Sequence, residues 1–132
     1  MFRLILRNII LVFLVFLYCD TTEPEEDVEI TVSSGNQPTF SWTIGPVNKL
    51  KVETHDGSGV VWAVYTPGKD SLFSSVKYLE VPSGAQLLTN TTIIGPVDQD
   101  EWRKSLIIGK KYVVKIADLA ENNLGIKVFT AH

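Results

Sequence analysis

Apolar and polar residues alternate with a period of two over much of the chain beyond residue 28, which is typical of half-buried β-strands. No stretch in this part has convincing helical periodicity. The alternation predicts strands around these apolar series: Val28, Ile30 and Val32; Phe40, Trp42 and Ile44; Leu50 and Val52; Tyr112, Val114 and Ile116; and the closing stretch 126–130.

Residues 60–65, "VVWAVY", form a more continuous apolar run that is consistent with a central strand. The segment "THDGSG" before this run is rich in turn formers, so Lys51–Tyr65 is predicted to be a hairpin. "ENNLG" is predicted to turn the chain into the last strand. Between residues 66 and 105, two proline-bearing turns and the polar "DQDEWRKS" leave strand count and register open.

Short strands separated by turn residues predict a sandwich of two antiparallel sheets. In "LIIGKKYVVKI", Leu106 precedes Tyr112 by six residues, with Gly109 between them. This motif resembles the tyrosine corner of fibronectin type III and related Greek-key domains, and the resemblance implies that the Tyr112 hydroxyl bonds back to the upstream chain. "PTFSWTIGP" resembles the second strand of that family, which implies that Trp42 fills the core. The expected fold is an all-β, antiparallel Greek-key β-sandwich of the fibronectin type III or immunoglobulin-like kind, spanning residues 28–132.

Residues 1–18 have the layout of a helical signal segment. Arg3 and Arg7 provide a positive start, and an uncharged apolar run follows from residue 9 to 18. A membrane-spanning helix needs about 20 apolar residues, so this run is short for a permanent anchor. A signal peptide at 1–18 is the favoured interpretation, with an uncleaved anchor as the alternative.

Cys19, the only cysteine, stands at the junction between the apolar run and an acidic segment. Residues 1–19 resemble a bacterial lipoprotein signal, although Tyr18 stands where that pattern usually has a small residue. The resemblance implies cleavage before Cys19, which would become the first mature residue and carry a diacylglycerol lipid, with palmitate as an expected fatty acid. The alternative is a cysteine buried as a small hydrophobe. With one cysteine, a disulfide scaffold is excluded.

The segment 19–27 is predicted to be an extended tether. Six of the fifteen acids lie between residues 20 and 29, and such a charged segment cannot bury enough apolar surface to fold. A plain spacer and an export signal like that of some Bacteroidota lipoproteins both remain open. "VVWAVY", "VKYLEVPSGA" and "GKKYVVKI" further resemble small envelope lipoproteins of Gram-negative bacteria, which implies a lipid-anchored location in the bacterial cell envelope, at the outer membrane.

Candidate chemistry is sparse. His55 and Asp56 are neighbours in a tight turn, where adjacent side chains point apart, so they do not predict a catalytic pair. Asp98, Asp100 and Glu101 resemble the start of a calcium loop, but the glycine and the bidentate glutamate of such a loop are missing. The sequence therefore predicts no enzyme, no metal and no cofactor. Lysines spread over several strands also argue against a nucleic-acid partner.

Aromatic residues are the remaining candidates for a binding site. Trp62, Tyr65, Tyr78 and Trp102 could stack sugar rings, but large aromatic residues in so small a domain usually lie in the core, and this is the alternative for Trp62 and Tyr78. Trp102 lies in the polar "DQDEWRKS" with no evident buried face, so it is the predicted contact residue. The predicted function is a non-enzymatic, lipid-anchored interaction or structural module whose ligand is left open, with a protein or a glycan as the expected kind of partner. The alternative is a surface carbohydrate-binding module.

Overall fold

The computed structural model describes residues 28–69, 72–89, 94–120 and 122–132. The predictions for the signal segment 1–18, for Cys19 and for the tether 19–27 lie outside the described residues. No helix in the described ranges is long and apolar enough to cross a membrane. The strands of the described part are β1 (Ile30–Val32), β2 (Thr39–Trp42), β3 (Lys49–Thr54), β4 (Val60–Tyr65), β5 (Ser75–Lys77), β6 (Gln86–Leu87), β7 (Lys111–Ala117) and β8 (Asn123–Thr130).

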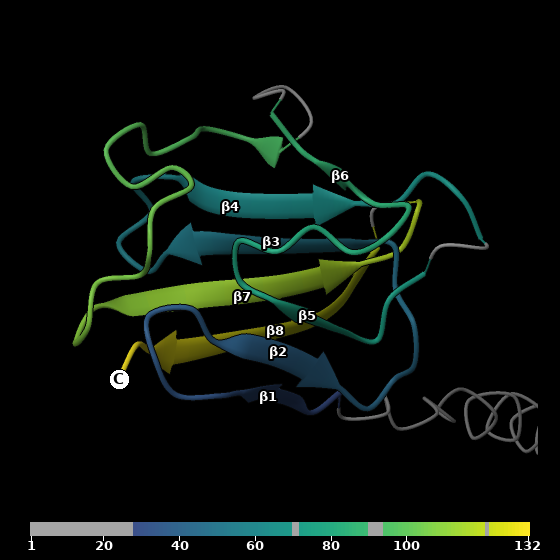
Figure 1. Cartoon of the computed structure of the whole chain (residues 1–132), viewed down its shortest axis with the longest axis horizontal. Coiled ribbons are helices and arrows are strands. Elements are labelled where there is room, and N and C mark those ends of the chain that lie inside the picture. The colour runs from purple at the N-terminus through teal and green to yellow at the C-terminus, as the bar shows by residue number, and fades with distance from the viewer. Residues whose placement is uncertain (1–27, 70–71, 90–93, 121) are drawn as a thin grey trace, which may run out of the picture.

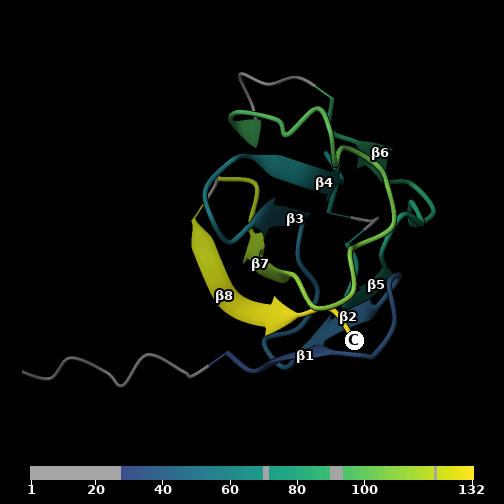
Figure 2. The ribbon, with the colours of Figure 1, turned by 90° about the vertical axis from the view of Figure 1, so that its left-hand side faces the viewer.

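The strands form two antiparallel sheets, which is consistent with the predicted β-sandwich. A three-stranded sheet has the order β1-β2-β5, and a five-stranded sheet has the order β6-β4-β3-β7-β8 (Figure 1). Figure 2 shows the curved five-stranded sheet with β1, β2 and β5 on one side of it. The core lies between the two sheets.

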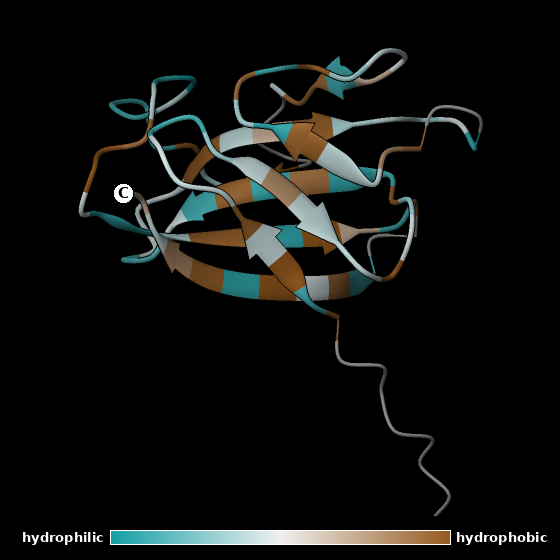
Figure 3. Ribbon diagram, turned by 60° about the horizontal axis from the view of Figure 1, so that its bottom comes forward, coloured by the Kyte–Doolittle hydropathy of each residue, from teal (hydrophilic) through white to brown (hydrophobic). Residues whose placement is uncertain are grey.

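The period of two explains which side chains enter this core. Along β7, Tyr112, Val114 and Ile116 are buried, whereas the residues between them are half-buried. Figure 3 shows the same alternation as changes of colour along the strands. Because successive side chains point to opposite faces of a sheet, each such strand contributes one apolar face to the interior.

Aromatic side chains fill the interior. Trp62 and Tyr78 are both buried and meet edge to face at 5.2 Å between ring centroids, so the prediction that they are core residues is confirmed. Trp42 is also buried and packs edge-on against Phe73 at 5.9 Å. Its indole Nε1–H donates a 2.7 Å hydrogen bond to the carbonyl of Gly45, which satisfies its polar atom.

The predicted hairpin Lys51–Tyr65 is confirmed, because β3 pairs antiparallel with β4. A β-bulge makes Val52 pair with Trp62 and Glu53 pair with Val60, so Val61 is an extra residue on β4. The bulge shifts which side chains point to each face, and β4 is buried on both faces because an apolar cluster covers each of them. Its inner face joins the main core, and its outer face joins a second apolar cluster.

Two strand boundaries differ from the prediction. The alternation predicts that Ile44 extends the second strand, but β2 ends at Trp42 and Ile44 is exposed. The last strand starts at Asn123 rather than at residue 126. A register shift between Ile116 and Ala117 lets Asn123 pair with Ala117, so residues predicted to belong to the turn are part of β8.

Candidate functional site

The described chain enters the domain at one end of the sandwich. A Cβ atom built on Gly125, near the start of β8, would lie 3.0 Å from Val28 Cγ1 and 3.2 Å from Ile116 Cγ1. Val28 therefore lies where β7 ends and β8 begins. We call this the entry end.

Three loops and the C-terminus gather at the opposite end, which we call the far end. Figure 1 shows the C-terminus at the end of β8, away from the start of that strand. Three backbone hydrogen bonds join these segments: Gly109 N to Ala131 O at 2.7 Å, His55 N to Lys111 O at 3.2 Å, and Leu106 N to Asn36 O at 2.9 Å. The far end thus presents loops 33–38, 55–59 and 98–110 on one surface.

Tyr112 fixes the turn that precedes β7. Its hydroxyl oxygen accepts a 3.0 Å hydrogen bond from the backbone N–H of Ile107, and its ring stacks on Phe129 at 5.9 Å. Burial raises the pKa of the Tyr112 hydroxyl, so this group stays protonated at neutral pH. Leu106 is buried beside it in the main core. These contacts hold the turn 107–110 in one position.

This turn projects two isoleucines into solvent. The Lys110 N–H donates a 3.0 Å bond to the Ile107 carbonyl, and Gly109 supplies the positive φ of 85° that such a turn requires. Ile107 and Ile108 are 54% and 59% exposed, which makes them the most exposed large apolar side chains at the far end. Two neighbouring apolar residues on a fixed turn form a natural contact point.

A polar network at the far end links the β3–β4 hairpin to the loop that follows residue 94. The Ser58 backbone N–H and hydroxyl both donate to Asp56 Oδ1, at 2.9 and 2.7 Å, and the same hydroxyl lies 3.0 Å from Asp98 Oδ2. The hydrogen bonds from Ser58 lower the pKa of Asp56 to about 2. His55 is exposed beside this network, and Asp56 Oδ1 accepts from Ser58 rather than from the imidazole.

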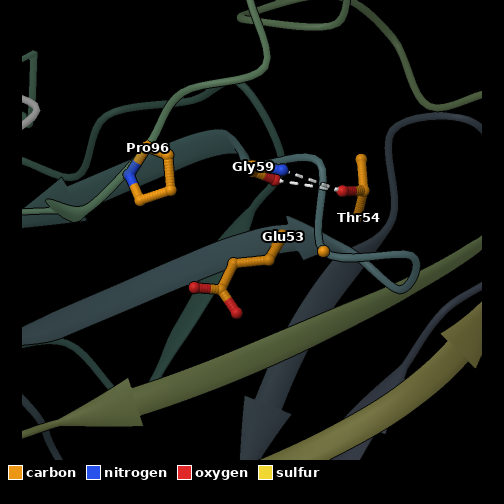
Figure 4. A pocket seen from close by; sticks show the side chains of 5 residues that line it. Glu53, Thr54, Gly59 and Pro96 are labelled. Carbon is orange, nitrogen blue, oxygen red and sulfur yellow. Dashed lines mark hydrogen bonds between the residues drawn. The ribbon is translucent and has the colours of Figure 1, made fainter.

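A small pocket of about 240 Å³ lies beside this hairpin and is lined by Glu53, Thr54, Gly57, Gly59 and Pro96 (Figure 4). Glu53 is its charged group. Its Oε1 lies 2.9 Å from Lys51 Nζ, and its Oε2 lies 2.7 Å from Lys115 Nζ. Burial alone would raise the pKa of Glu53, but hydrogen bonds from the two lysines outweigh it and hold the pKa below the ordinary value. The pocket therefore offers an ionised carboxylate to a hydrogen-bond donor.

Trp102 is placed differently from the prediction. The polar sequence around it predicts no buried face, but its side chain is half-buried and packs on the outer cluster of the five-stranded sheet. The backbone next to Trp102 is held there, because the backbone N–H of Arg103 donates a 2.8 Å hydrogen bond to the Val61 carbonyl. The outer cluster consists of Val60, Ala63, Leu88 and Ile94, with Tyr65, Val97 and Trp102 packed against it. Trp102 is therefore a packing residue with a partly exposed edge.

The structure brings together residues that sequence reasoning did not connect. In the sequence interpretation, Ile107 and Ile108 count only as part of "LIIGKKYVVKI", the segment that resembles a tyrosine corner. Two isoleucines directly before a turn glycine are nevertheless a visible signal of exposed apolar residues. The contacts of Glu53 with Lys51 and Lys115 require the pairing of β3 with β7, which no local pattern specifies. In the described ranges, no group of three or more histidine, cysteine, aspartate or glutamate side chains could hold a metal ion.

Comparisons of the chain with protein families, with curated proteins and with solved structures found no match.

Proposed function

We propose that this chain is a lipid-anchored interaction module of the bacterial cell envelope that presents its far end to a protein partner. The observation that carries the proposal is the opposite placement of chain entry and contact residues. Val28 lies at the entry end, while Ile107 and Ile108 lie at the far end. A tether attached before Val28 would leave these isoleucines facing away from the anchoring membrane.

The anchor in this proposal is Cys19, acylated after removal of the signal peptide 1–18. Val28 lies nine positions after Cys19. An extended chain spans at most about 3.3 to 3.6 Å per residue, so the tether reaches roughly 30 Å from the lipid. The acids between residues 20 and 29 favour extension through mutual repulsion, and more strongly above an anionic bilayer. The domain would thus sit close to the outer membrane.

The strand order supports a Greek-key domain of the fibronectin type III or immunoglobulin-like kind. After the β3–β4 hairpin, the chain crosses to pair β5 with β2 in the other sheet and then returns to pair β7 with β3. Among the described strands, sequential strands pair within one sheet as β1-β2, β3-β4 and β7-β8, and β5 alone crosses back to the first sheet before β6 returns beside β4. Such crossings between the two sheets are typical of Greek-key sandwiches. The Tyr112 hydroxyl bond and buried Leu106 are further points of likeness. Domains of this architecture commonly present binding loops at one end of the sandwich.

A non-enzymatic role fits the polar groups at the far end. The carboxylate of Asp56 is engaged by Ser58, and Glu53 is engaged by two lysines. Such groups stabilise loops and strand pairs, whereas catalysis needs a base that can reach a substrate proton. The exposed isoleucines favour contact instead.

A surface carbohydrate-binding module is the second candidate. The pocket beside Glu53 favours it, because each carboxylate oxygen that pairs with a lysine keeps a further lone pair that can accept a hydrogen bond from a sugar hydroxyl. The partly exposed ring of Trp102 could add a stacking surface, although the pocket itself is lined by other residues.

Site-specific photo-crosslinking in intact envelopes tests the proposal. A photoreactive residue at position 108 should capture a discrete protein partner. The matched control places the same residue at position 119, which carries Leu119, exposed at 42% in the turn between β7 and β8 at the entry end. Equal labelling from both positions, or none from position 108, would refute the far-end proposal. Capture of polysaccharide from position 108 would favour the carbohydrate alternative.

A further inference from the structure

The β8 strand has no backbone ladder on its side away from β7 in the described part, although β1 of the other sheet lies close to its inner face. β8 is the longest described strand. The other described strands at sheet edges are shorter: β1 and β5 have three residues each, and β6 has two. An unpaired edge of this length is a template for another strand.

The residues that present this open edge follow from the hydrogen bonds of Ala131. Its N–H donates to the Lys110 carbonyl, and its carbonyl accepts from Gly109, so Ala131 faces β7. Backbone groups alternate in direction along an antiparallel strand. The pairing of β7 with β8 is regular from Thr130 back to Gly125. Ile126, Val128 and Thr130 therefore direct their N–H and C=O groups away from the sheet.

The side chains on this edge are apolar and accessible. Ile126 and Val128 are 55% and 50% exposed on the outer face of the sheet. Val113, which pairs directly with Val128, is half-buried beside them. A strand added to β8 would bring its own side chains next to this apolar strip, since neighbouring strands lie about 4.8 Å apart.

The charge around the edge is positive. Strands β7 and β8 contain three lysines, Lys111, Lys115 and Lys127, and no acid. Glu53 neutralises only part of this positive charge, because its carboxylate forms ion pairs with Lys51 as well as with Lys115. On the inner side of β8, Lys127 Nζ reaches the Ile30 carbonyl at 2.7 Å. This contact keeps the ammonium group at the seam between the sheets without neutralising it.

We propose that β8 accepts an extended acidic and apolar segment of a partner protein as an added strand. Alternate residues of that segment would pack their apolar side chains beside Ile126 and Val128. The residues between them would place carboxylates near Lys127. Main-chain hydrogen bonds supply the affinity in this mode of recognition, and alternate side chains supply the specificity. The inference rests on the proposed interaction function and identifies a second surface that serves it.

A second copy of the chain fits this edge less well. Antiparallel pairing of two β8 strands that matches Ile126 with Val128 also places Lys127 opposite the other copy's Lys127. Like charges directly opposite each other destabilise a strand pair. That pairing would also point the two entry ends in opposite directions, whereas copies anchored in one membrane share one direction. An acidic strand removes both conflicts.

Binding of a synthetic strand to the full chain in detergent tests the proposal. The probe is a capped eight-residue peptide of alternating valine and glutamate, and the control replaces every glutamate with lysine. We expect saturable binding of the acidic peptide by fluorescence anisotropy and at least tenfold weaker binding of the basic one. Lys127→Glu should reverse this preference while its thermal unfolding shows that it remains folded. Equal binding of both peptides, or an unchanged preference in the variant, would refute the proposal that β8 accepts an acidic strand.

Amide hydrogen exchange locates the added strand. Bound peptide should slow exchange at Ile126 and Val128, whose N–H groups face outward. Exchange at Lys127 and Phe129 should change little, because β7 already protects these amides. Slowed exchange elsewhere but not at Ile126 and Val128 would refute strand addition. A concentration-dependent dimer that the peptide does not dissociate would assign the edge to a second copy. Crosslinking from position 108 is independent of these results, so failure here would leave the far-end proposal standing.

Discussion

The hydroxyl of Tyr112 lies 3.0 Å from the backbone nitrogen of Ile107, five residues upstream, and accepts its hydrogen. One side chain on β7 thereby fixes the turn that exposes Ile107 and Ile108. Tyr112 is 1% exposed, so this bond forms at the boundary between the core and the far end. The contact links the stability of the sandwich to the geometry of the proposed binding surface.

Replacing Tyr112 with phenylalanine should lower the free energy of unfolding by about 1 to 3 kcal/mol, because the Ile107 N–H loses its partner while the ring still packs. Urea denaturation measures this loss. Ile108→Ala is the matched control and should stay within about 0.5 kcal/mol, since its side chain is exposed. Equal stability of Tyr112→Phe and the native protein would show that the hydroxyl bond contributes nothing.

Trp102→Ala should lower the free energy of unfolding by roughly 1 to 3 kcal/mol. Complete burial of a tryptophan would predict about 3 to 5 kcal/mol, but Trp102 is half-buried on the outer cluster. Thermal and urea unfolding can measure the change. Trp62→Ala serves as the fully buried comparison and should be more damaging. A Trp102 variant as stable as the native protein would restore the sequence-based prediction of a surface residue.

Glycines 57 and 59 lie in the same hairpin and should respond differently to substitution. A Cβ atom on Gly59 would lie 2.5 Å from Asp98 N, at a φ of 146°, so Gly59→Ala must displace backbone. A Cβ atom on Gly57 would meet nothing within 4 Å, at a φ of 81°. We expect Gly57→Ala to cost about 1 to 2 kcal/mol through its left-handed backbone. Gly59→Ala should cost more, by roughly 1 to 3 kcal/mol, through the added clash. Similar unfolding midpoints for the two variants would contradict this close approach.

The sequence predicts a strand correctly where the alternation of apolar and polar residues is long and regular, as in β7. It fails where burial depends on distant segments. The extra residue Val61 changes which β4 side chains face outward, and this position exists only once β3 and β4 have paired. The expectation that Trp102 has no buried face is wrong for the same reason, whereas its role as a contact residue stays a prediction. Its neighbours in "DQDEWRKS" are polar, whereas the apolar surface that it covers comes from β4 and from residues 88 and 94.

The candidate site is predicted less completely than the fold. The resemblance of "LIIGKKYVVKI" to a tyrosine corner implies a bond from the Tyr112 hydroxyl to the upstream chain, and the structure has this bond at Ile107, within a local segment. The open edge of β8 has no local signal, because edge position depends on the order of all strands in the sheet. The acids and lysines of β3 and β7 also show their pairing only in the folded register.

Stability should depend on pH through Glu53. Its folded pKa lies below the ordinary value of 4.5, so the folded state favours the ionised carboxylate. The pair of lysine contacts therefore contributes stability above about pH 4.5, and this contribution is lost as the pH falls through the folded pKa. Glu53→Gln should reduce the free energy of unfolding near neutral pH, and its difference from the native protein should shrink in acid. Urea unfolding at several pH values between about 3 and 7 measures this trend.

Glu80→Gln is the control for that pH series. Glu80 pairs with Lys77 at 3.0 Å, but its side chain is 65% exposed. Exposed ion pairs contribute at most about 1 kcal/mol, so this variant should resemble the native protein at every pH. A stability difference for Glu53→Gln that stays constant from neutral to acid pH would show that the carboxylate charge is not what stabilises this part of the sheet.

Cys19→Ser tests the anchor that gives the far end its orientation. If Cys19 is acylated, the variant should lose labelling by a radioactive or clickable fatty acid and should accumulate with residues 1–18 still attached. The lipid chain supplies about 0.8 kcal/mol per buried CH₂, so a processed protein without it should leave the membrane fraction. Replacing residues 1–18 of the Cys19→Ser variant with a conventional cleavable signal peptide tests this second step. Unchanged fatty-acid labelling of Cys19→Ser would exclude acylation at this residue, and the chain would then need an uncleaved N-terminal helix to hold the domain at the membrane.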